Sequence, residues 1–367
     1  MQEVFRRYKN PFWISAITLV ALSLYGIVSY FPEEEFQDAY EIRKSASERA
    51  YAAFERIKTL RSEKNIPIDP VIDPYNSGLV GVEISSVTSS AGKLSAKLVS
   101  LHPDFAAWFV QRFREAGLKP GDTISAGITG SFPALNVAFF AAADAMGLKT
   151  IVIGSVSSSQ FGANLPGLLW PDMEGDLIKN GFIENRTSFF SVGGIDDRGI
   201  GIDKEGADLI RDSISKNGYR FLSSDSFEQS LLKRMRIYET SNILLYVNIG
   251  GGTVSAGTGL GKGRIPRGIV FSSDENISSP DSVMKRFLEK KIPILHVIGI
   301  ESLASEAGMK YEIGTVAIPG SSNLLIRRKP SRSLAAFALA VLILFLWIFS
   351  GRISNGSEQT QNPSVRL

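Results

Sequence analysis

Two long stretches without charge stand out in the hydrophobic pattern, one near each end of the chain. Residues 10–32 contain no charged side chain, and neither do Ser333 to Gly351. At a rise of about 1.5 Å per residue, a helix of either length approaches the roughly 30 Å thickness of a bilayer core. The pattern therefore predicts two transmembrane helices, over 10–32 and 333–350, which bracket the rest of the chain.

Between these stretches, the apolar positions follow helical and strand spacing in turn. Residues 33–64 have the pattern of an amphipathic juxtamembrane helix, which is either a stalk or the first helix of the domain. A strand-like run at Leu79 to Ile84 comes next, and from Pro103 onward helical and strand-like segments alternate with short connections. This alternation predicts an α/β domain over 65–326, with a Rossmann-like, mostly parallel sheet and flanking helices.

The basic residues around the two uncharged stretches give conflicting orientations. Arg6, Arg7 and Lys9 precede the first stretch, which predicts a cytoplasmic N-terminal segment (1–9) and an extracytoplasmic central domain. The basic cluster at Arg327 to Lys329 would place that domain inside instead. Because the first helix usually dominates, we expect a two-pass protein of the cell (inner) membrane whose polar tail, 351–367, is also cytoplasmic.

Composition narrows the possible chemistry. The chain has no cysteine, which excludes disulfides, thiol catalysis and cysteine-based metal sites. Its formal net charge of +3 is spread along the chain and gives no footprint for nucleic acid, so we expect no nucleic-acid partner. Neither a Walker loop nor a dinucleotide fingerprint occurs in the right context, and we expect neither a cofactor nor a metal ion.

The turn between one predicted strand and the next helix is the most informative segment. Thr129, Gly130 and Ser131 follow the strand-like run that starts near Thr123, and Phe132-Pro133 opens a helix. Backbone N–H groups at a helix N-terminus favour an anion or a developing oxyanion. The alternative is a tight strand-to-helix turn without a ligand.

Other small, polar loops follow predicted strands and would meet at the same edge of the sheet. One is the Ser155 to Asn164 loop, and another is Asn248 to Thr253, which resembles the phosphate loops of the actin and sugar-kinase superfamily but has Asn248 in place of the usual acidic residue. The loop from Gly193 to Gly199 carries two carboxylates, and we interpret it as a solvated turn. The candidate ligand-binding residues are Thr129, Gly130, Ser131, Ser157, Ser158, Ser159, Asn164, Gly250, Gly251, Gly252 and Thr253.

Catalytic candidates are few. Ser131 is a candidate nucleophile, with Asp172 or Glu174 as its base; these acids belong to the cluster Trp170 to Asp176, which could equally cap a helix. His102 fits a surface or capping position and His296 a buried strand, so no Ser-His-Asp triad can be assigned. Whether the protein is an enzyme stays open.

Four segments together resemble a known family. They are Thr88 to Ala107 (TSSAGKLSAKLVSLHPDFAA), Lys119 to Ala138 (KPGDTISAGITGSFPALNVA), Ser157 to Glu174 (SSSQFGANLPGLLWPDME) and Tyr246 to Gly259 (YVNIGGGTVSAGTG). With them, the chain resembles the family called poly-gamma-glutamate system protein. The resemblance implies an association with bacterial genes that make and export poly-γ-glutamate or a related capsule-like polymer of the cell envelope. The resemblance does not identify any catalytic residue.

Three functions are therefore open. The first is a membrane-anchored accessory component that binds an anionic γ-glutamyl polymer, or other proteins of the synthesis and export system, at the Ser/Gly-rich edge. The second is a hydrolase or transferase that acts on the polymer through an activated hydroxyl. The third is a structural scaffold of the complex. Plentiful hydrogen-bond donors and scarce bases favour the first.

Overall fold

The computed structural model describes residues 11–258, 264–271, 280–310 and 316–355, with side chains described only between residues 15 and 348. Two compact units divide the chain. Gln37 to Leu325 forms the larger one, and the segments before and after it form the smaller one. The predicted N-terminal segment 1–9 and most of the predicted tail lie outside the described residues, as does Gly259.

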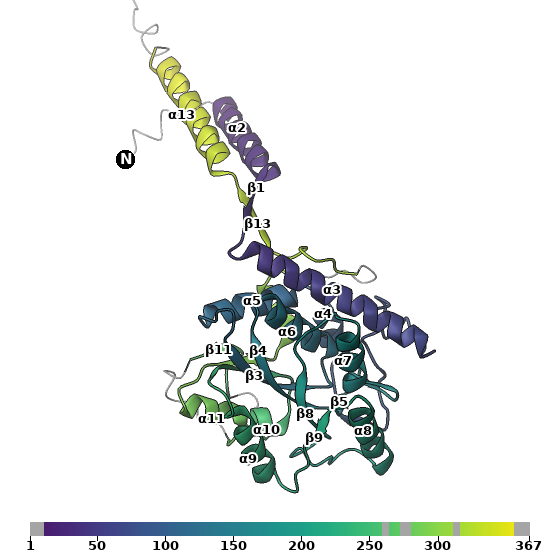
Figure 1. The fold of residues 1–367 in the computed structure, drawn as a ribbon. Helices are drawn as coiled ribbons and strands as arrows, with labels where there is room; N and C mark the ends of the chain where they lie inside the picture. The colour runs from purple at the N-terminus through teal and green to yellow at the C-terminus, as the bar shows by residue number, and fades with distance from the viewer. Residues whose placement is uncertain (1–10, 259–263, 272–279, 311–315, 356–367) are drawn as a thin grey trace, which may run out of the picture. The chain divides into compact units, whose positions relative to one another are not determined.

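A seven-stranded mixed sheet forms the centre of the larger unit (Figure 1). Six neighbouring strands run parallel, and the edge strand β11 is antiparallel to β12. In spatial order the strands are β11 (Gly268–Val270), β12 (Ile294–Val297), β10 (Ile243–Ile249), β3 (Thr123–Thr129), β4 (Lys149–Ser155), β8 (Thr187–Ser191) and β9 (Arg220–Phe221). The unit is thus an α/β domain.

Two groups of helices cover the sheet, and Figure 1 shows α5 and α6 on the opposite side from α9 and α11. The first group consists of α3 (Tyr40–Glu63), α5 (Phe105–Glu115), α6 (Pro133–Ala145), α7 (Trp170–Lys179) and α8 (Lys204–Lys216). The second consists of α9 (Phe227–Tyr238), α10 (Thr253–Ala256) and α11 (Val283–Glu289). Two groups are expected because right-handed crossovers place helices on opposite faces when the strand order reverses.

Shorter elements complete the domain. The helices α4 (Leu94–Ser100) and α12 (Ile300–Glu306) pack against each other. The strand β2 (Thr88–Ser90) runs parallel to β5 (Ser158–Ser159), and β6 (Asn164–Leu165) pairs with β7 (Leu168–Leu169) in an antiparallel hairpin. The predicted strand at Leu79 to Ile84 is wrong, because this segment is extended but pairs with no strand of the described chain.

The helix starts follow local chemistry that can be read in the sequence. The side chains of Asp203, Ser226 and Ser282 accept hydrogen bonds from the third residue after each of them, at 2.7, 3.1 and 3.2 Å. Each bond satisfies one of the N–H groups that the first turn leaves without a partner. Pro133 opens α6 at a position where the missing N–H has no intrahelical role.

Helix α3 is the first helix of the domain and not a stalk. It packs against α5 and α6, and its face of Ala46, Ala50, Ala53 and Ile57 is fully buried. The preceding residues, which the sequence assigns to the same helix, instead form the strand β1 (Pro32–Phe36). The amphipathic spacing was therefore correct for the buried face, but the helix starts at Tyr40.

The smaller unit contains two helices and a two-stranded ribbon. Helix α2 (Pro11–Tyr30) lies beside α13 (Arg332–Asn355), and β1 pairs antiparallel with β13 (Ile326–Pro330). The ribbon places acidic β1 residues opposite basic β13 residues. Arg328 lies 3.0 Å from Glu34, and Lys329 lies 2.7 Å from Glu35. The basic cluster that complicated the orientation argument is thus the partner of the acidic one.

The two uncharged stretches form helices, but not the predicted transmembrane ones. Within the part of the chain that the structure describes, no helix combines enough length with enough apolar character to cross a bilayer. The predicted membrane helices over 10–32 and 333–350 are therefore wrong. The predicted two-pass location in the cell membrane, with an extracytoplasmic central domain, depended on these helices and is corrected with them.

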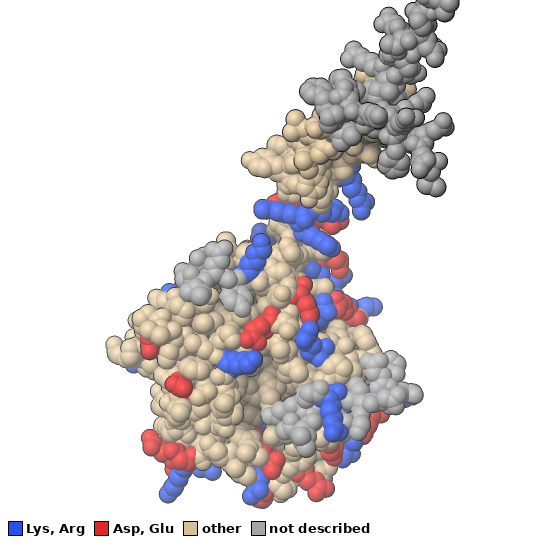
Figure 2. Space-filling view, turned by 180° about the vertical axis from the view of Figure 1, so that it is seen from behind, with Lys and Arg blue, Asp and Glu red and all other residues tan. Residues whose placement is uncertain are grey.

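Charged side chains on the domain surface are mixed in sign. On the face in Figure 2, Lys and Arg side chains are interspersed with Asp and Glu over the α/β domain. Several of them form exposed ion pairs, such as Arg267 with Glu306 and Arg286 with Asp281. Such pairs contribute little stability, so the domain depends mainly on its apolar core.

Candidate functional site

A cavity lies at the carboxyl edge of the sheet, where the strand order reverses. From β3 the chain passes through α6 to β4 on one side, whereas β10 on the other side is reached later, through α9. Ligands bind outside the carboxyl ends of strands at such switch points in open parallel sheets. Here Thr129 of β3, Ser155 of β4 and the loop after β10 line a cavity of about 350 Å³. This volume lies at the lower end of the range for small-molecule sites.

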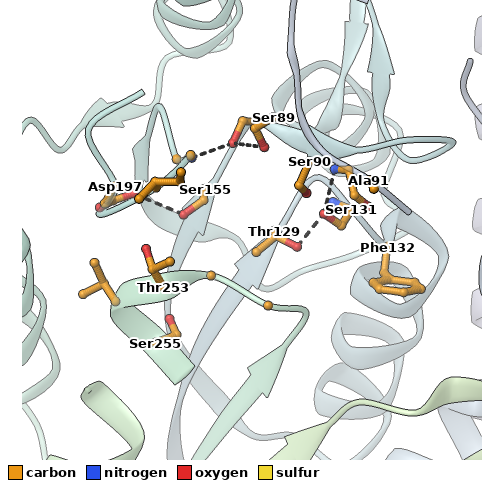
Figure 3. Close-up of a pocket in the computed structure, with 18 of the residues that line it drawn as sticks. Ser89, Ser90, Ala91, Thr129, Ser131, Phe132, Ser155, Asp197, Thr253 and Ser255 are labelled. Carbon is orange, nitrogen blue, oxygen red and sulfur yellow. Dashed lines mark hydrogen bonds between the residues drawn. The ribbon is translucent and has the colours of Figure 1, made fainter. Parts of the chain in front are cut away.

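Hydroxyl groups dominate the wall of this cavity. Figure 3 shows the labelled side chains around one open space, with Asp197 and Ser155 at one end and Ser131 and Phe132 at the other. A hydroxyl can donate or accept a hydrogen bond, so the wall suits a ligand with several oxygen atoms. The lining hydroxyls belong to Ser89, Ser90, Thr129, Ser131, Ser155, Ser157, Ser159, Thr253 and Ser255.

A buried ion pair forms one end of the cavity. Arg234 on α9 lies 2.8 Å from a carboxylate oxygen of Asp197, which belongs to the loop after β8, and both side chains are buried. The hydroxyls of Ser191 and Ser230 donate to the same carboxylate at 2.5 and 2.6 Å. The charge of Arg234 is thus compensated by an acid that is itself hydrogen-bonded, which is the condition for burying a charge without a large penalty.

The loop that carries Asp197 has an unusual backbone. Asp196 and Asp197 adopt φ values of +55° and +62°, in the left-handed region that Asp tolerates better than most residues. The N–H of Asp196 donates to the Thr253 hydroxyl at 2.9 Å, which joins this loop to the start of α10. At Gly193 a Cβ atom would lie 2.3 Å from the Ser157 hydroxyl. The interpretation of this loop as a solvated turn is therefore wrong for Asp197.

A buried lysine lies behind the other end of the cavity, in contact with three of the residues that line it. Lys97 on α4 is 3% exposed. Its Nζ donates to Ser159 Oγ at 2.8 Å and to the carbonyl oxygen of Ser131, and it lies 3.8 Å from the centre of the Phe132 ring. Among the described residues, no carboxylate forms an ion pair with it. Burial without a counter-charge lowers the pKa of Lys97 to about 7.

Ser131 and Ser159 are connected across this end. The backbone N–H of Ser159 donates to Ser131 Oγ at 3.0 Å, so the turn before α6 and the strand β5 hold each other in place. Ser131 N–H in turn faces the Thr129 hydroxyl at 3.3 Å. The Ser131 hydroxyl is thus already an acceptor within the protein, whereas the Ser159 hydroxyl is the one that contacts a basic group.

Seven of the eleven predicted ligand-binding residues line the cavity. They come from three loops that are far apart in the sequence, and the sheet brings them together at one edge. The seven residues are Thr129, Ser131, Ser157, Ser159, Gly251, Gly252 and Thr253. Their role in ligand binding stays a prediction.

The other four predicted residues support the fold around the cavity. Asn164 is buried, and its side chain forms two hydrogen bonds with the backbone of Val82. Its Oδ1 accepts from Val82 N–H at 3.0 Å, and its Nδ2 donates to Val82 O at 2.8 Å. The Ser158 hydroxyl donates to a neighbouring carbonyl oxygen. Gly130 and Gly250 leave room for close neighbours, because a Cβ atom would lie 2.4 Å from Val156 O and 2.5 Å from Thr129 Oγ1 respectively.

Asp172 and Glu174 do not line the cavity, although the sequence suggests them as bases. Asp172 caps α7 by accepting from Leu169 N–H at 2.9 Å, and it also contacts Asn217 at 2.8 Å. Glu174 is fully buried and accepts from both the N–H and the hydroxyl of Thr187, at 2.6 and 2.7 Å. Burial raises the pKa of Glu174 to about 7. Both acids serve the packing of α7, so neither can activate Ser131.

The two histidines also have structural surroundings. His102 Nδ1 accepts from the N–H of Asp104 at 3.2 Å, and its Nε2 lies 3.2 Å from the Ser321 hydroxyl. A catalytic triad needs the opposite arrangement, with Nδ1–H donated to a carboxylate. His102 is also buried, so of the two predicted positions, surface or capping, the surface one is wrong. His296 lies buried in β12, as predicted, with Nδ1 3.2 Å from Ile265 O.

Sequence reasoning missed the charged residues of the site. Lys97, Asp197 and Arg234 lie on three separate elements, and no local motif marks them. The run Ser85 to Gly92 is conspicuous in the sequence, yet only the structure places Ser89 and Ser90 over the end of β3. A signal for Lys97 did exist, since it is the one basic residue inside the apolar pattern from Leu94 to Val99.

Comparison with known proteins adds no relative. No family model, no curated protein and no solved structure matches the chain. The resemblance to the poly-gamma-glutamate system protein family thus stays a prediction from the four sequence segments.

Proposed function

We propose that the protein binds a carboxylate-bearing γ-glutamyl ligand in the cavity at the end of β3, as a component of a system that handles poly-γ-glutamate or a related anionic polymer. The observation that carries this proposal is the buried Lys97, whose ammonium group has hydrogen-bond acceptors but no counter-charge among the described residues. A carboxylate in the cavity would supply that charge.

The energetic reason is the penalty of a buried, unpaired cation. Desolvation alone brings the pKa of Lys97 from its usual 10.5 to about 7, which means that the charged form is strongly disfavoured in the empty protein. A bound anion near Nζ reverses this effect and raises the pKa again. The ligand therefore gains a charge-assisted hydrogen bond, and the surrounding hydroxyls of Ser157 and Thr253 can contact its remaining oxygen atoms.

The γ-glutamyl identity comes from the sequence resemblance, and the cavity is compatible with it. A γ-linked glutamate chain offers an α-carboxylate and an amide in each unit, which need cationic or N–H donors together with neutral hydrogen-bonding groups. The wall presents a row of hydroxyls, Lys97 lies directly behind Ser131 and Ser159, and the first turn of α6 adds the positive end of a helix dipole on the side of Ser131. Other proteins of the polymer system are the expected partners.

Calorimetry of the full chain with a short γ-linked glutamate oligomer tests the proposal. At pH 8 most Lys97 side chains are neutral, so binding should take up a proton, which is seen as a dependence of the heat on buffer ionisation enthalpy. Lys97→Met should weaken binding about tenfold to hundredfold and abolish the proton uptake, because a hydrogen bond to a charged group contributes about 1.5–3 kcal/mol.

Lys93→Met is the matched control, since Lys93 is exposed at the start of the same helix. It should leave both affinity and proton uptake unchanged. If the oligomer does not bind, or if Lys97→Met binds it as tightly as the unaltered protein does, the proposal is wrong. Loss of binding in Lys93→Met as well would point to a general surface charge effect and would also contradict it.

A further inference from the structure

Ser159 and Lys97 together have the arrangement of a nucleophile and its base. Ser159 lines the cavity, and its Oγ lies 2.8 Å from Lys97 Nζ, within the distance needed for direct proton transfer. Ser131, the nucleophile that the sequence suggests, lacks this contact, since Lys97 reaches its backbone carbonyl and its hydroxyl accepts from Ser159 N–H. Ser159 is therefore a better candidate nucleophile than Ser131.

We propose that the cavity is a catalytic site for acyl transfer, in which Ser159 attacks the carbonyl carbon of a γ-glutamyl amide and Lys97 is its general base. This inference rests on the proposed function for the class of substrate, but the pairing of Ser159 with Lys97 is independent of it.

Lys97 meets the requirements for a lysine base. A lysine can accept a proton only as a neutral amine, which a buried site without a counter-charge favours. Catalysis therefore requires the scissile amide, and not a carboxylate of the ligand, to face Nζ; in the carboxylate-bound form of the proposed function Lys97 is protonated and cannot act as a base. The elements around Lys97 bring no acid to it among the described residues. Glu301 on α12, the helix packed on α4, bonds instead to Ser95 at 2.8 Å, and the Phe132 ring covers one side of Nζ. Lys97 is also held in place, because the Ser131 carbonyl oxygen accepts one of its protons.

The Ser159 side chain borders the cavity on one side. On another side the backbone of Gly92 packs closely against it, since a Cβ atom at that position would lie 3.0 Å from Ser159 Oγ. The Ser159 side chain comes from β5, whose pairing with β2 fixes the backbone on both sides of it. A nucleophile must be accessible on one side and fixed on the other, and both conditions hold here.

The reaction proceeds in two balanced stages. Ser159 Oγ forms a bond to the carbonyl carbon while Lys97 Nζ takes its proton. The C–N bond of the amide then breaks, and the leaving amine receives that proton, which leaves an ester on Ser159. In the second stage water, or an acceptor amine, attacks the ester carbonyl and gives a proton to Lys97. The C–O bond to Ser159 breaks, and the proton returns to Ser159 Oγ. The positive end of the α6 dipole lies on the side of Ser131, where the developing oxyanion would form.

The first experiment follows cleavage of poly-γ-glutamate of defined length by the full chain, with the binding assay run on the same preparations. Ser159→Ala should lower the cleavage rate by up to about 10⁶-fold, as expected for the loss of a nucleophile, and change affinity less than threefold. Lys97→Arg should lose cleavage to a similar degree although the positive charge remains, because arginine does not deprotonate in proteins. Lys93→Met, at an exposed position at the start of the same helix, is the control and should cleave normally.

A fluorophosphonate probe gives a second measurement that does not depend on the substrate. Peptide mass spectrometry should find the probe on Ser159, and labelling should follow a pH profile with a midpoint near the pKa of Lys97, about 7. Labelling of Ser131 instead, or equal labelling in Lys97→Arg, would overturn the proposal.

The two assays separate this inference from the proposed function. If the oligomer binds but is not cleaved and Ser159 is not labelled, the catalytic inference fails and the binding function stands. If Ser159 is labelled in a Lys97-dependent way but no γ-glutamyl ligand binds, the pair of residues is catalytic and the substrate class is wrong.

Discussion

A buried basic side chain lies at one end of the cavity and another lies behind the residues that line its other end, and the two have opposite surroundings. Arg234 is paired with Asp197 and shares two serine hydroxyls with it, so its charge is fully compensated. Lys97 is also deeply buried, but of the residues that the structure describes, the ammonium group contacts a hydroxyl, a carbonyl oxygen and an aromatic ring and no acid. A satisfied charge stabilises one conformation, whereas an unsatisfied one is available to a ligand or a proton. From this difference we assign a structural role to the Arg234 end and a role in ligand binding or proton transfer to the Lys97 end.

Removing the partner of Arg234 should have the largest effect on stability. Asp197→Asn leaves a buried guanidinium without a counter-charge, and we expect the free energy of unfolding to fall by about 3–5 kcal/mol. Asparagine tolerates the left-handed backbone of this position, so the change isolates the charge. Urea unfolding of the full chain measures it.

Asp196→Asn is the control for that experiment. Asp196 shares the left-handed backbone but forms no ion pair with any described residue, and its substitution should change stability by less than about 0.5 kcal/mol. Equal effects of the two substitutions would show that the Arg234 end does not depend on charge compensation. The contrast between Arg234 and Lys97 would then be wrong.

Lys97→Met should act differently, because it removes a charge that the fold does not compensate. The pKa of Lys97 is lowered from 10.5 to about 7 on folding, so between these pH values the unfolded chain binds the proton and the folded protein does not. Stability of the unaltered protein should therefore rise with pH across this window, by up to about 1.4 kcal/mol per pH unit, and the penalty should be complete below pH 7.

The measurement compares urea unfolding of Lys97→Met and the unaltered protein at pH 6, 8 and 10. Lys97→Met should be at least as stable at pH 6, and the unaltered protein should gain on it as the pH rises. A difference that is constant with pH would mean that Lys97 has a compensating acid after all, like Arg234.

An exposed ion pair should have the smallest effect and shows how much of the comparison is due to burial. Glu34 and Arg328 lie 3.0 Å apart on the ribbon of β1 and β13, with both side chains largely in solvent. Glu34→Gln should lower the free energy of unfolding by less than about 1 kcal/mol. A loss as large as that of Asp197→Asn would show that pairing alone, irrespective of burial, decides the energy.

The alternation of helices and strands could be read from the sequence because its causes are local. The strand-like run that starts near Thr123 agrees with the first residue of β3, and the helix opened by Phe132-Pro133 agrees with α6, which starts at Pro133. Periodicity also gave the buried face of α3. It misassigned Leu79 to Ile84, since an apolar run forms a strand only where a neighbouring strand can pair with it.

The uncharged stretches and the site were harder to predict, for different reasons. Absence of charge in 10–32 and 333–350 predicted membrane helices, and the described helices do not meet that requirement. The serine and glycine loops were recognised because strand ends converge at one edge of a parallel sheet. Lys97 was not, because its acceptors Ser131 and Ser159 lie 34 and 62 residues further along the chain. The burial that changes its chemistry exists only after the chain folds.

The first and last residues of the larger unit lie next to each other in space. The N–H of Gln37, its first residue, donates to the carbonyl oxygen of Leu325, its last residue, at 2.9 Å. A chain whose two ends are hydrogen-bonded neighbours can be joined by a short linker and reopened at an exposed turn, because circular permutation requires only that the ends be close. We therefore expect a circular permutant of the larger unit to keep the geometry at the end of β3. We expect the same when the unit is inserted into another protein.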